Sequence, residues 1–446
     1  MFQILTKMAA RFSPHQRKII SNTGWLLISR VLRTVVNLFI TALIARYLQP
    51  DGYGQLQYAL AFCSFFLPLS TAQMGDVVTR DLVKNPEDQS RILGTAFTVQ
   101  LFGGMIAAIS AIAMSLLIAP TNSLMHLLVA IISLKFIFIS GQPIENWFDS
   151  KVDSKFKVFA GNIAFAIITA IEFSLVLNQA PLYTFAITVS LESLIYGLGL
   201  FFFYSWNHQN PLQWRTDFSR IRYLLIESMP LCFSTVSLVL YKNLDRVMLA
   251  NLVDNQSVGI YSSAATLAES LCFLPTILCV SLYPTIIRAK HLEASVYNEK
   301  LQKIYDLVAL TAYLLILGLA PIAGFVITLI YGQAYQAAIP IFSLYIWSSL
   351  FSFLGIVQSR WIVAEGLQKF NFYSRVTGLA LNLALNLVLI PRYQAVGATI
   401  ATIISYAIAN YVFFLFIPRT RDNAHLMTKA LFLPFRLPQF LKSFSA

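Results

Sequence analysis

Twelve apolar runs, most of them 20 residues or longer, follow one another along this chain with little sequence between them. About 20 apolar residues in a helix cross the roughly 30 Å of hydrocarbon in a bilayer, because each residue adds about 1.5 Å. Only 12% of the chain is charged, against about a quarter in soluble domains. The sequence therefore predicts an all-α polytopic membrane protein of about 12 transmembrane helices. The expected spans are residues 19–48, 52–74, 91–119, 123–144, 157–178, 181–206, 221–252, 257–288, 301–331, 335–364, 370–391 and 394–417.

Basic residues alternate between the connections that join these spans. Of the 32 Lys and Arg residues, 24 lie in the N-terminal arm, the C-terminal tail and every second connection, while only Arg46 and Arg392 flank the others. Short cytoplasmic loops collect Lys and Arg. The pattern therefore predicts an even number of spans with both termini in the cytoplasm. It also assigns the net charge of +12 to contact with anionic membrane lipids, and no motif supports nucleic acid as a partner.

Two segments 205 residues apart share a pattern. Gly54 and Ala59 in the second span correspond to Gly259 and Ala264 in the eighth. This internal repeat indicates two halves of six spans each, oriented the same way, with any transport site between them. The expected domains are a cytoplasmic arm (1–18), an N-terminal six-helix lobe (19–206), a cytoplasmic linker (207–220), a C-terminal six-helix lobe (221–417) and a basic cytoplasmic tail (418–446).

The first span carries two arginines inside the region that lipid would surround. Arg30 and Arg33 share one helical stripe with Thr34, Asn37 and Thr41, while apolar residues cover the rest of the helix. An arginine that faced hydrocarbon would cost about 2.5–3.5 kcal/mol. We therefore expect both arginines to face protein, water or an anionic ligand.

Two further arginines extend this pattern. Arg246 lies in the seventh span, which is equivalent to the first in the repeat, and Arg360 lies in the tenth. Cationic walls on facing helices would create a positive potential, and guanidinium groups bind phosphate oxygens in bidentate pairs. The alternative is that the arginines pair internally and fix helix packing. The first interpretation predicts a cationic cavity that binds a phosphate-like anion through Arg30, Arg33, Asn37, Arg246 and Arg360.

Other polar side chains within the spans have simpler explanations. Lys242 and Asp245 lie one turn apart, so we expect them to pair locally. Asn382 and Asn386 lie at i and i+4 on the eleventh span. Interhelical hydrogen bonding is the favoured interpretation of the two asparagines, with recognition of sugar hydroxyls as the alternative.

A carboxylate such as Glu269 or Glu192 is a candidate for binding a coupling cation, although structural pairing would explain it equally well. The five histidines and four cysteines show no catalytic or metal-binding spacing. Walker A and dinucleotide glycine patterns are absent. We therefore expect no enzyme activity, no cofactor and no metal, and ATP is not the direct energy source.

Eight segments carry a resemblance to a known family. They are NTGWLL (22–27), IARYLQPDGYG (44–54), RDLV (80–83), LGTA (93–96), LDRVML (244–249), VGIY (258–261), NLALN (382–386) and GATIAT (397–402). In them the chain resembles polysaccharide-biosynthesis membrane proteins, the lipid-linked oligosaccharide (O-antigen) flippases of the multidrug/oligosaccharidyl-lipid/polysaccharide exporter superfamily. Gln49 and Gln394 stand where this family often has glycine.

The resemblance implies two six-helix lobes around a central cavity. It also implies a substrate, a polyprenyl-diphosphate-linked oligosaccharide, which such a flippase moves from the inner to the outer leaflet of a bacterial-type plasma membrane. Membrane lipids and other polysaccharide assembly proteins are the further expected partners. A drug/cation antiporter of the same superfamily is an alternative that predicts an acidic cavity. A membrane polymerase or ligase is a second alternative, against which the short external connections count.

Overall fold

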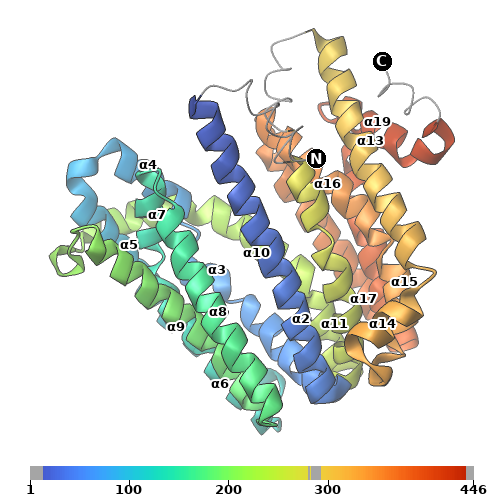
Figure 1. Cartoon of the computed structure of the whole chain (residues 1–446), viewed down its shortest axis with the longest axis horizontal. Coiled ribbons are helices and arrows are strands. Elements are labelled where there is room, and N and C mark those ends of the chain that lie inside the picture. The colour runs from blue at the N-terminus through green and yellow to red at the C-terminus, as the bar shows by residue number, and fades with distance from the viewer. Residues whose placement is uncertain (1–13, 280–281, 283–292, 438–446) are drawn as a thin grey trace.

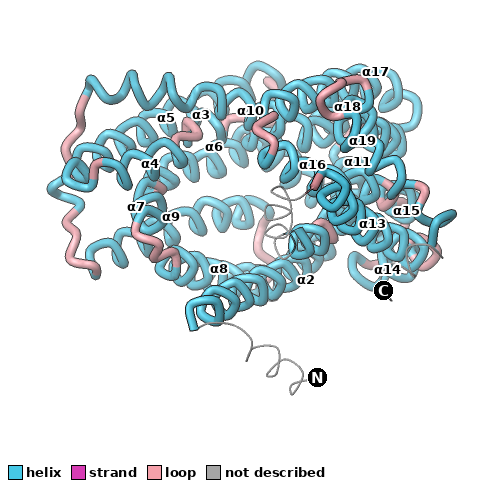
Figure 2. Tube along the Cα trace, turned by 90° about the horizontal axis from the view of Figure 1, so that it is seen from above, coloured by secondary structure: helices cyan, strands magenta, loops and turns pink. Residues whose placement is uncertain are grey.

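The structure, a computed structural model, is helical throughout the part of the chain that it describes. That part comprises residues 14–279, 282 and 293–437, with side chains from Val31 onward apart from Ala294. Figure 2 shows the helices joined by short loops, and no strand occurs among these residues. This architecture confirms the all-α fold. Helices satisfy their own backbone hydrogen bonds, as a chain in hydrocarbon requires.

The described part of the N-terminal half, from residue 14 onward, contains eight α-helices. They are α2 (Pro14–Ser64), α3 (Leu67–Thr71), α4 (Gly75–Lys84), α5 (Gln89–Ile118), α6 (Ser123–Phe138), α7 (Pro143–Ser150), α8 (Lys155–Leu177) and α9 (Leu182–Trp206). Short 3-10 helices connect some of them, namely η1 (Pro86–Asp88), η2 (Ile139–Gly141) and η3 (Pro211–Gln213), which precedes the second half.

The C-terminal half begins with α10, and its described helices continue to residue 431. They are α10 (Phe218–Leu252), α11 (Asn255–Ser270), α13 (Ala294–Leu319), α14 (Ala323–Tyr331), α15 (Ala338–Tyr345), α16 (Ser348–Ala364), α17 (Gln368–Ala407), α18 (Phe413–Leu415) and α19 (Arg421–Leu431). The 3-10 helix η4 (Gln333–Tyr335) precedes α15, and the π-helix η5 (Ile408–Val412) joins α17 to α18.

Ten stretches of the described chain are long and apolar enough to cross a membrane. Two of them contain a residue with non-helical backbone angles, Gln49 in α2 and Gln394 in α17. If each of these two is taken as a pair of helical arms, the ten stretches become the predicted twelve spans. Large apolar side chains such as Leu32, Phe102 and Leu387 are exposed on these helices, as lipid-facing residues are.

Gln49 and Gln394 adopt a conformation that glycine prefers. Their φ angles are 58° and 50°, in the left-handed region that a side chain disfavours. At Gln49 the side-chain amide donates to the carbonyl oxygen of Arg46 at 2.7 Å and so stabilises the end of the first arm. Both glutamines therefore occupy turns between spans.

The two halves diverge from one shared end of the molecule (Figure 1), with the first arm of α2 between α8 and the C-terminal helices. At the shared end one apolar core contains buried residues of both halves, including Tyr53 and Ala59 of α2 and Val258 and Ala264 of α11. A second core, around Trp147, lies in the N-terminal half and includes one buried residue of α10, Leu224. The halves therefore share one core at this end, and away from it the first turns of α10 pack against the N-terminal half.

Several connections predicted to share one side of the membrane meet at this joined end. The hydroxyl of Tyr335 donates to the carbonyl oxygen of Ala45 at 2.8 Å, and Arg46 Nε donates to the carbonyl oxygen of Ile330 at 2.8 Å. The hydroxyl of Tyr47 donates to the carbonyl oxygen of Ala180 at 2.7 Å. The alternation of basic and non-basic loops therefore corresponds to a real grouping of these connections in space.

The two glycines of the repeat bring the two lobes into backbone contact. A Cβ atom added to Gly54 would lie 1.7 Å from the carbonyl oxygen of Asn255, and one added to Gly259 would lie 1.9 Å from that of Pro50. Both neighbours are backbone atoms, which cannot rotate away. The second arm of α2 and the start of α11 therefore touch backbone to backbone, as small residues allow in membrane helices.

This contact generates a prediction. We expect Gly54→Ala and Gly259→Ala each to lower the stability of the protein, because the added methyl group forces the two helices apart. Overpacking of this kind costs about 1–3 kcal/mol. Thermal unfolding of the purified protein in lipid nanodiscs measures the effect.

Gly318→Ala in α13 is the matched control, because nothing lies within 4 Å of a Cβ atom there. Alanine is a better helix former than glycine by about 1 kcal/mol, so this variant should keep or gain stability. Equal melting temperatures for Gly54→Ala and Gly318→Ala would contradict the assignment.

Candidate functional site

A cavity of about 580 Å³ lies between the two lobes and is lined by both. From the N-terminal lobe, α2 contributes Arg33, Thr34 and Asn37, α8 contributes Phe165 and Glu172, and α9 contributes Glu192. From the C-terminal lobe, α11 contributes Thr266, Glu269 and Ser270. We call this the inter-lobe cavity. It is the place where a repeat of this kind is expected to hold a transported ligand.

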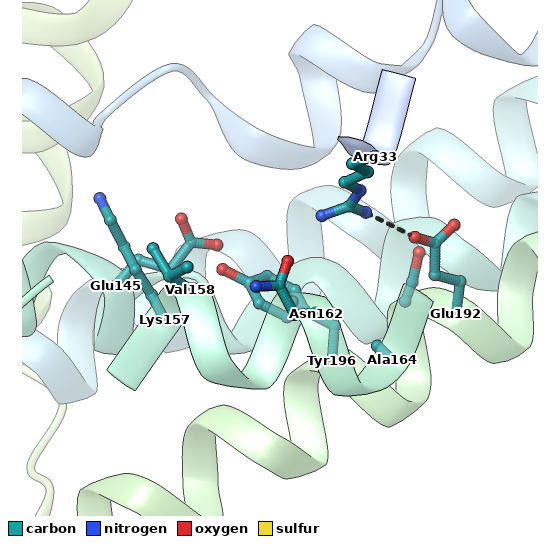
Figure 3. A pocket seen from close by; sticks show the side chains of 10 residues that line it. Arg33, Glu145, Lys157, Val158, Asn162, Ala164, Glu192 and Tyr196 are labelled. Carbon is teal, nitrogen blue, oxygen red and sulfur yellow. Dashed lines mark hydrogen bonds and ion pairs between the residues drawn. The ribbon is translucent and has the colours of Figure 1, made fainter. Parts of the chain in front are cut away.

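A second pocket, of about 590 Å³, adjoins the inter-lobe cavity within the N-terminal lobe and shares Arg33 and Glu192 with it. Figure 3 shows its lining, with Arg33 on one side and Glu145, Lys157 and Tyr196 on the other. Together the two spaces form a polar region that surrounds Arg33.

Arg33 is the predicted residue that lies most directly in this region. Its Nη2 donates to Glu192 Oε1 at 2.9 Å, and its guanidinium group lies 4.7 Å from the centre of the Phe165 ring. Both members of the ion pair are partly exposed, at 43% for the Arg33 side chain and 37% for Glu192. Ion pairs that reach water contribute only about 0–1 kcal/mol. The pair can therefore open without a large loss of stability.

Arg246 lies in a different environment. It is 8% exposed, its Nε donates to Ser262 Oγ at 3.3 Å and its Nη1 donates to Asn243 Oδ1 at 3.0 Å. Its Nη2 lies 3.7 Å from Glu269 Oε2. Arg246 therefore holds the wall of the inter-lobe cavity through Glu269 and is not itself among the lining residues.

The remaining residues predicted to bind the anion lie in different places relative to the cavity. Asn37 lines the inter-lobe cavity. Arg360 is exposed on α16 and lines neither of the two spaces around Arg33. Arg30 lies in α2, but its side chain is outside the described residues.

The prediction of a cationic cavity is wrong for the lining that the structure describes. Around the inter-lobe cavity Arg33 is accompanied by three carboxylates, Glu172, Glu192 and Glu269. Glu172 accepts from the hydroxyl of Thr188 at 2.9 Å. The reason lies in the tertiary structure, because α8, α9 and α11 each turn one glutamate toward the same space. The sequence marked Glu192 and Glu269 as candidate cation ligands but did not indicate that they share a cavity with Arg33. Glu192, Ser193 and Tyr196 do form a helical stripe on α9 that would have indicated this face.

The predicted local pair between Lys242 and Asp245 is not formed. Asp245 is 3% exposed and points into the C-terminal lobe, where its Oδ2 accepts from Tyr261 at 2.6 Å and from Thr402 at 2.5 Å. Its Oδ1 accepts from Asn386 Nδ2 at 2.6 Å. Three neutral donors thus replace the expected lysine.

The two asparagines of α17 complete this buried cluster. Asn386 Nδ2 also donates to Asn382 Oδ1 at 3.0 Å. Hydrogen bonding between helices, the favoured interpretation of these asparagines, is confirmed by the bond from Asn386 to Asp245 on α10. Asn386 Oδ1 and Asn382 Nδ2 are buried and lack a hydrogen-bond partner among the described residues. We call Asp245, Tyr261, Asn382, Asn386 and Thr402 the Asp245 cluster.

Comparison with known proteins agrees with the fold. Residues 19–290 match the family described as "Polysaccharide biosynthesis protein". The chain is 22% identical over 413 residues to the capsular polysaccharide biosynthesis protein CapF of Staphylococcus aureus, with 90% of this chain and all of the relative covered.

Solved structures are similar over nearly the whole chain. The lipid II flippase MurJ in an inward closed conformation has a TM-score of 0.72 at 15% identity, with 92% of this chain and 91% of that chain covered. An inward-facing multidrug resistance MATE family transporter of the MOP superfamily has a TM-score of 0.69 at 11% identity, with 89% and 96% covered. An outward-facing conformation of such a transporter has a TM-score of 0.58 at 12% identity, with 89% and 94% covered.

The family match covers more than half of the chain, and the two-lobe helical fold agrees with it. The relatives and structural neighbours named here are transporters, flippases or polysaccharide biosynthesis proteins by description. The chain is therefore a multi-pass membrane protein of the polysaccharide biosynthesis protein family, with the fold of the MOP-superfamily transporters.

Proposed function

We propose that the protein is a flippase for a polyprenyl-diphosphate-linked oligosaccharide. It moves this lipid from the inner to the outer leaflet of a bacterial plasma membrane for polysaccharide or O-antigen biosynthesis. The observation that carries the proposal is Arg33, held at the boundary of the inter-lobe cavity by an ion pair that reaches water. The family and its described relatives support the glycan-linked substrate.

The mechanism is alternating access with an exchange of partners at Arg33. The planar guanidinium group that now holds Glu192 binds one face of the diphosphate in a bidentate pair. The polyprenyl tail stays in lipid, and Asn37 lies beside Arg33 in the cavity lining.

Release of the Glu192 carboxylate from Arg33 could couple substrate binding to the binding of a cation. Once Arg33 binds the diphosphate, Glu192 shares the inter-lobe cavity with Glu172 and Glu269 and has lost its cation. Like charges that share one cavity repel, so binding of a cation there becomes favourable. Substrate binding and cation binding are coupled through this single ion pair.

The orientation follows from the basic loops. Connections with Lys and Arg face the cytoplasm together with both termini, and the joined end of the lobes faces outward. Other polysaccharide assembly proteins then receive the glycan on the outer side.

Replacement of Arg33 tests the anion site. Arg33→Ala should reduce outer-leaflet exposure of labelled lipid-linked glycan at least tenfold, in cells whose own copy of the gene is deleted. Arg33→Lys should retain part of the activity, because lysine keeps the charge and loses the bidentate geometry. Unchanged exposure in Arg33→Ala would sink the proposed role of Arg33.

Two controls accompany this measurement. Arg392→Ala removes an exposed arginine near the turn in α17 and should leave exposure of the glycan unchanged. Glu192→Gln removes the competitor for Arg33, so the glycan lipid should bind at least as tightly as in the parent protein.

The Asp245 cluster is a second point at which a cation could act, because side-chain oxygens of three helices meet there. Asp245→Asn should lower stability, since one hydrogen bond to a charged group contributes about 1.5–3 kcal/mol. If the cluster couples transport to a cation, sodium or protons should stabilise the parent protein, and that effect should vanish in the variant. A cluster with a structural role alone predicts the loss of stability without any cation dependence. Melting temperatures over a sodium series and a pH series distinguish the two.

Export of organic cations is the second candidate function, and the three glutamates of the inter-lobe cavity favour it. It predicts efflux of a fluorescent organic cation that depends on Glu172 or Glu269 and continues in Arg33→Ala. The flippase proposal predicts that the same vesicles show no such efflux.

A further inference from the structure

A third cavity, of about 330 Å³, lies inside the C-terminal lobe. Its lining comes from α10, α11, α15, α16, α17 and η5, so it is separate from the pocket around Arg33. Its volume lies within the range of about 300–1,000 Å³ found for small-ligand sites. We call it the C-lobe pocket.

The walls of the C-lobe pocket are rich in hydroxyl and amide groups. Five serines line it, and they are joined by the side-chain amides of Asn371, Asn410 and Gln358. The rings of Tyr241 and Tyr406 lie 5.1 Å apart and form one wall. Hydroxyl and amide groups beside an aromatic wall match the edges and faces of a sugar ring.

Two buried polar groups in this lining lack a partner. Gln358 is 2% exposed and its Nε2 has no hydrogen-bond partner among the described residues. Tyr241 is 6% exposed and its hydroxyl is likewise unpaired there. Buried donors are almost always satisfied in native proteins. Because both atoms are unpaired and enclosed by protein, a ligand with acceptor oxygens would satisfy them once these two side chains turn toward the pocket.

The charge of the lining favours an anionic ligand. Lys242 and Arg375 are its two basic residues, and neither makes an ion pair among the described residues. The contact seen for Arg375 is a hydrogen bond from Nη1 to Ser234 Oγ at 3.4 Å. The carboxylate in the lining, Glu269, already accepts from Tyr345 at 2.8 Å and faces Arg246. The positive charge of Lys242 and Arg375 is thus available to a ligand.

Glu269 also connects this pocket with the proposed transport path, since it lines both the C-lobe pocket and the inter-lobe cavity. A diphosphate at Arg33 and a sugar in the C-lobe pocket would thus each occupy a space that Glu269 lines. A single substrate with an anchored headgroup could therefore occupy both spaces.

We infer that the C-lobe pocket binds a carboxylated sugar unit of the transported glycan, with Arg375 and Lys242 on the carboxylate and Gln358 and Tyr241 on ring oxygens. The inference deepens the proposed flippase function and rests on it for the source of the sugar. It does not depend on Arg33, which lies outside this pocket.

Binding of tritiated D-glucuronate to the full-length protein in nanodiscs tests the inference directly. Saturable binding is expected, with unlabelled glucuronate competing at a concentration at least tenfold lower than glucose or inorganic phosphate. Arg375→Gln should weaken binding at least tenfold. Arg392→Gln, on the same helix and outside the pocket, should leave it unchanged.

The variant Gln358→Leu tests whether Gln358 binds the sugar or only stabilises the fold. Leucine removes an unsatisfied buried amide while nearly keeping its size, so the melting temperature without glucuronate should rise while binding weakens. A lower melting temperature would indicate that Gln358 serves the fold and would count against the assignment.

Absence of saturable binding, equal affinity in Arg375→Gln, or phosphate competing as well as glucuronate would each overturn the inference. Failure here is distinguishable from failure of the flippase proposal, because binding is measured without transport. Loss of glucuronate binding with intact Arg33-dependent glycan exposure would remove only the pocket. Binding without any glycan exposure would leave the pocket and remove the flippase function.

Discussion

An ionised side chain in the hydrocarbon layer needs a partner. The two lobes supply this partner in different ways, and the difference decides whether the charged group can exchange it. The N-terminal lobe pairs Arg33 with Glu192 at a boundary that water reaches. The C-terminal lobe surrounds Asp245 with three neutral donors and buries Arg246 behind Glu269. The first arrangement can exchange partners and the second is fixed. One lobe is thereby suited to handle a charged headgroup, while the other keeps its shape around a pocket.

Much of the fold could be predicted from the sequence, because it depends on local signals. Apolar runs mark the spans, and the polar residues around Gln49 and Gln394 mark the turns within α2 and α17. The repeat was visible in the spacing of Gly54 and Gly259. That these two glycines touch each other could not be predicted, since spacing gives equivalence and carries no information about distance.

The site was harder to predict because partner choice is a tertiary property. The stripe of Arg33 and Asn37 on α2 was correctly placed at a cavity. Its carboxylate is 159 residues away, and several glutamates in the sequence were equally plausible partners. Proximity along the helix suggested a pair between Lys242 and Asp245, yet Asp245 turns inward and Lys242 is exposed. The C-lobe pocket could not be predicted, because its serines and amides come from several helices, although Lys242 and Glu269 of its lining stood out in the sequence.

The glycine contact between α2 and α11 has a geometric consequence. Equivalent positions of two repeated halves can meet only where the axis relating the halves passes between them. Gly54 and Gly259 therefore lie beside that axis, and their backbones leave no side chain to absorb a change in spacing. A rotation of one lobe against the other displaces atoms in proportion to their distance from such a fulcrum. If the lobes rotate about this contact, as the proposed alternating access requires, the ends of the lobes farthest from the two glycines make the largest movement.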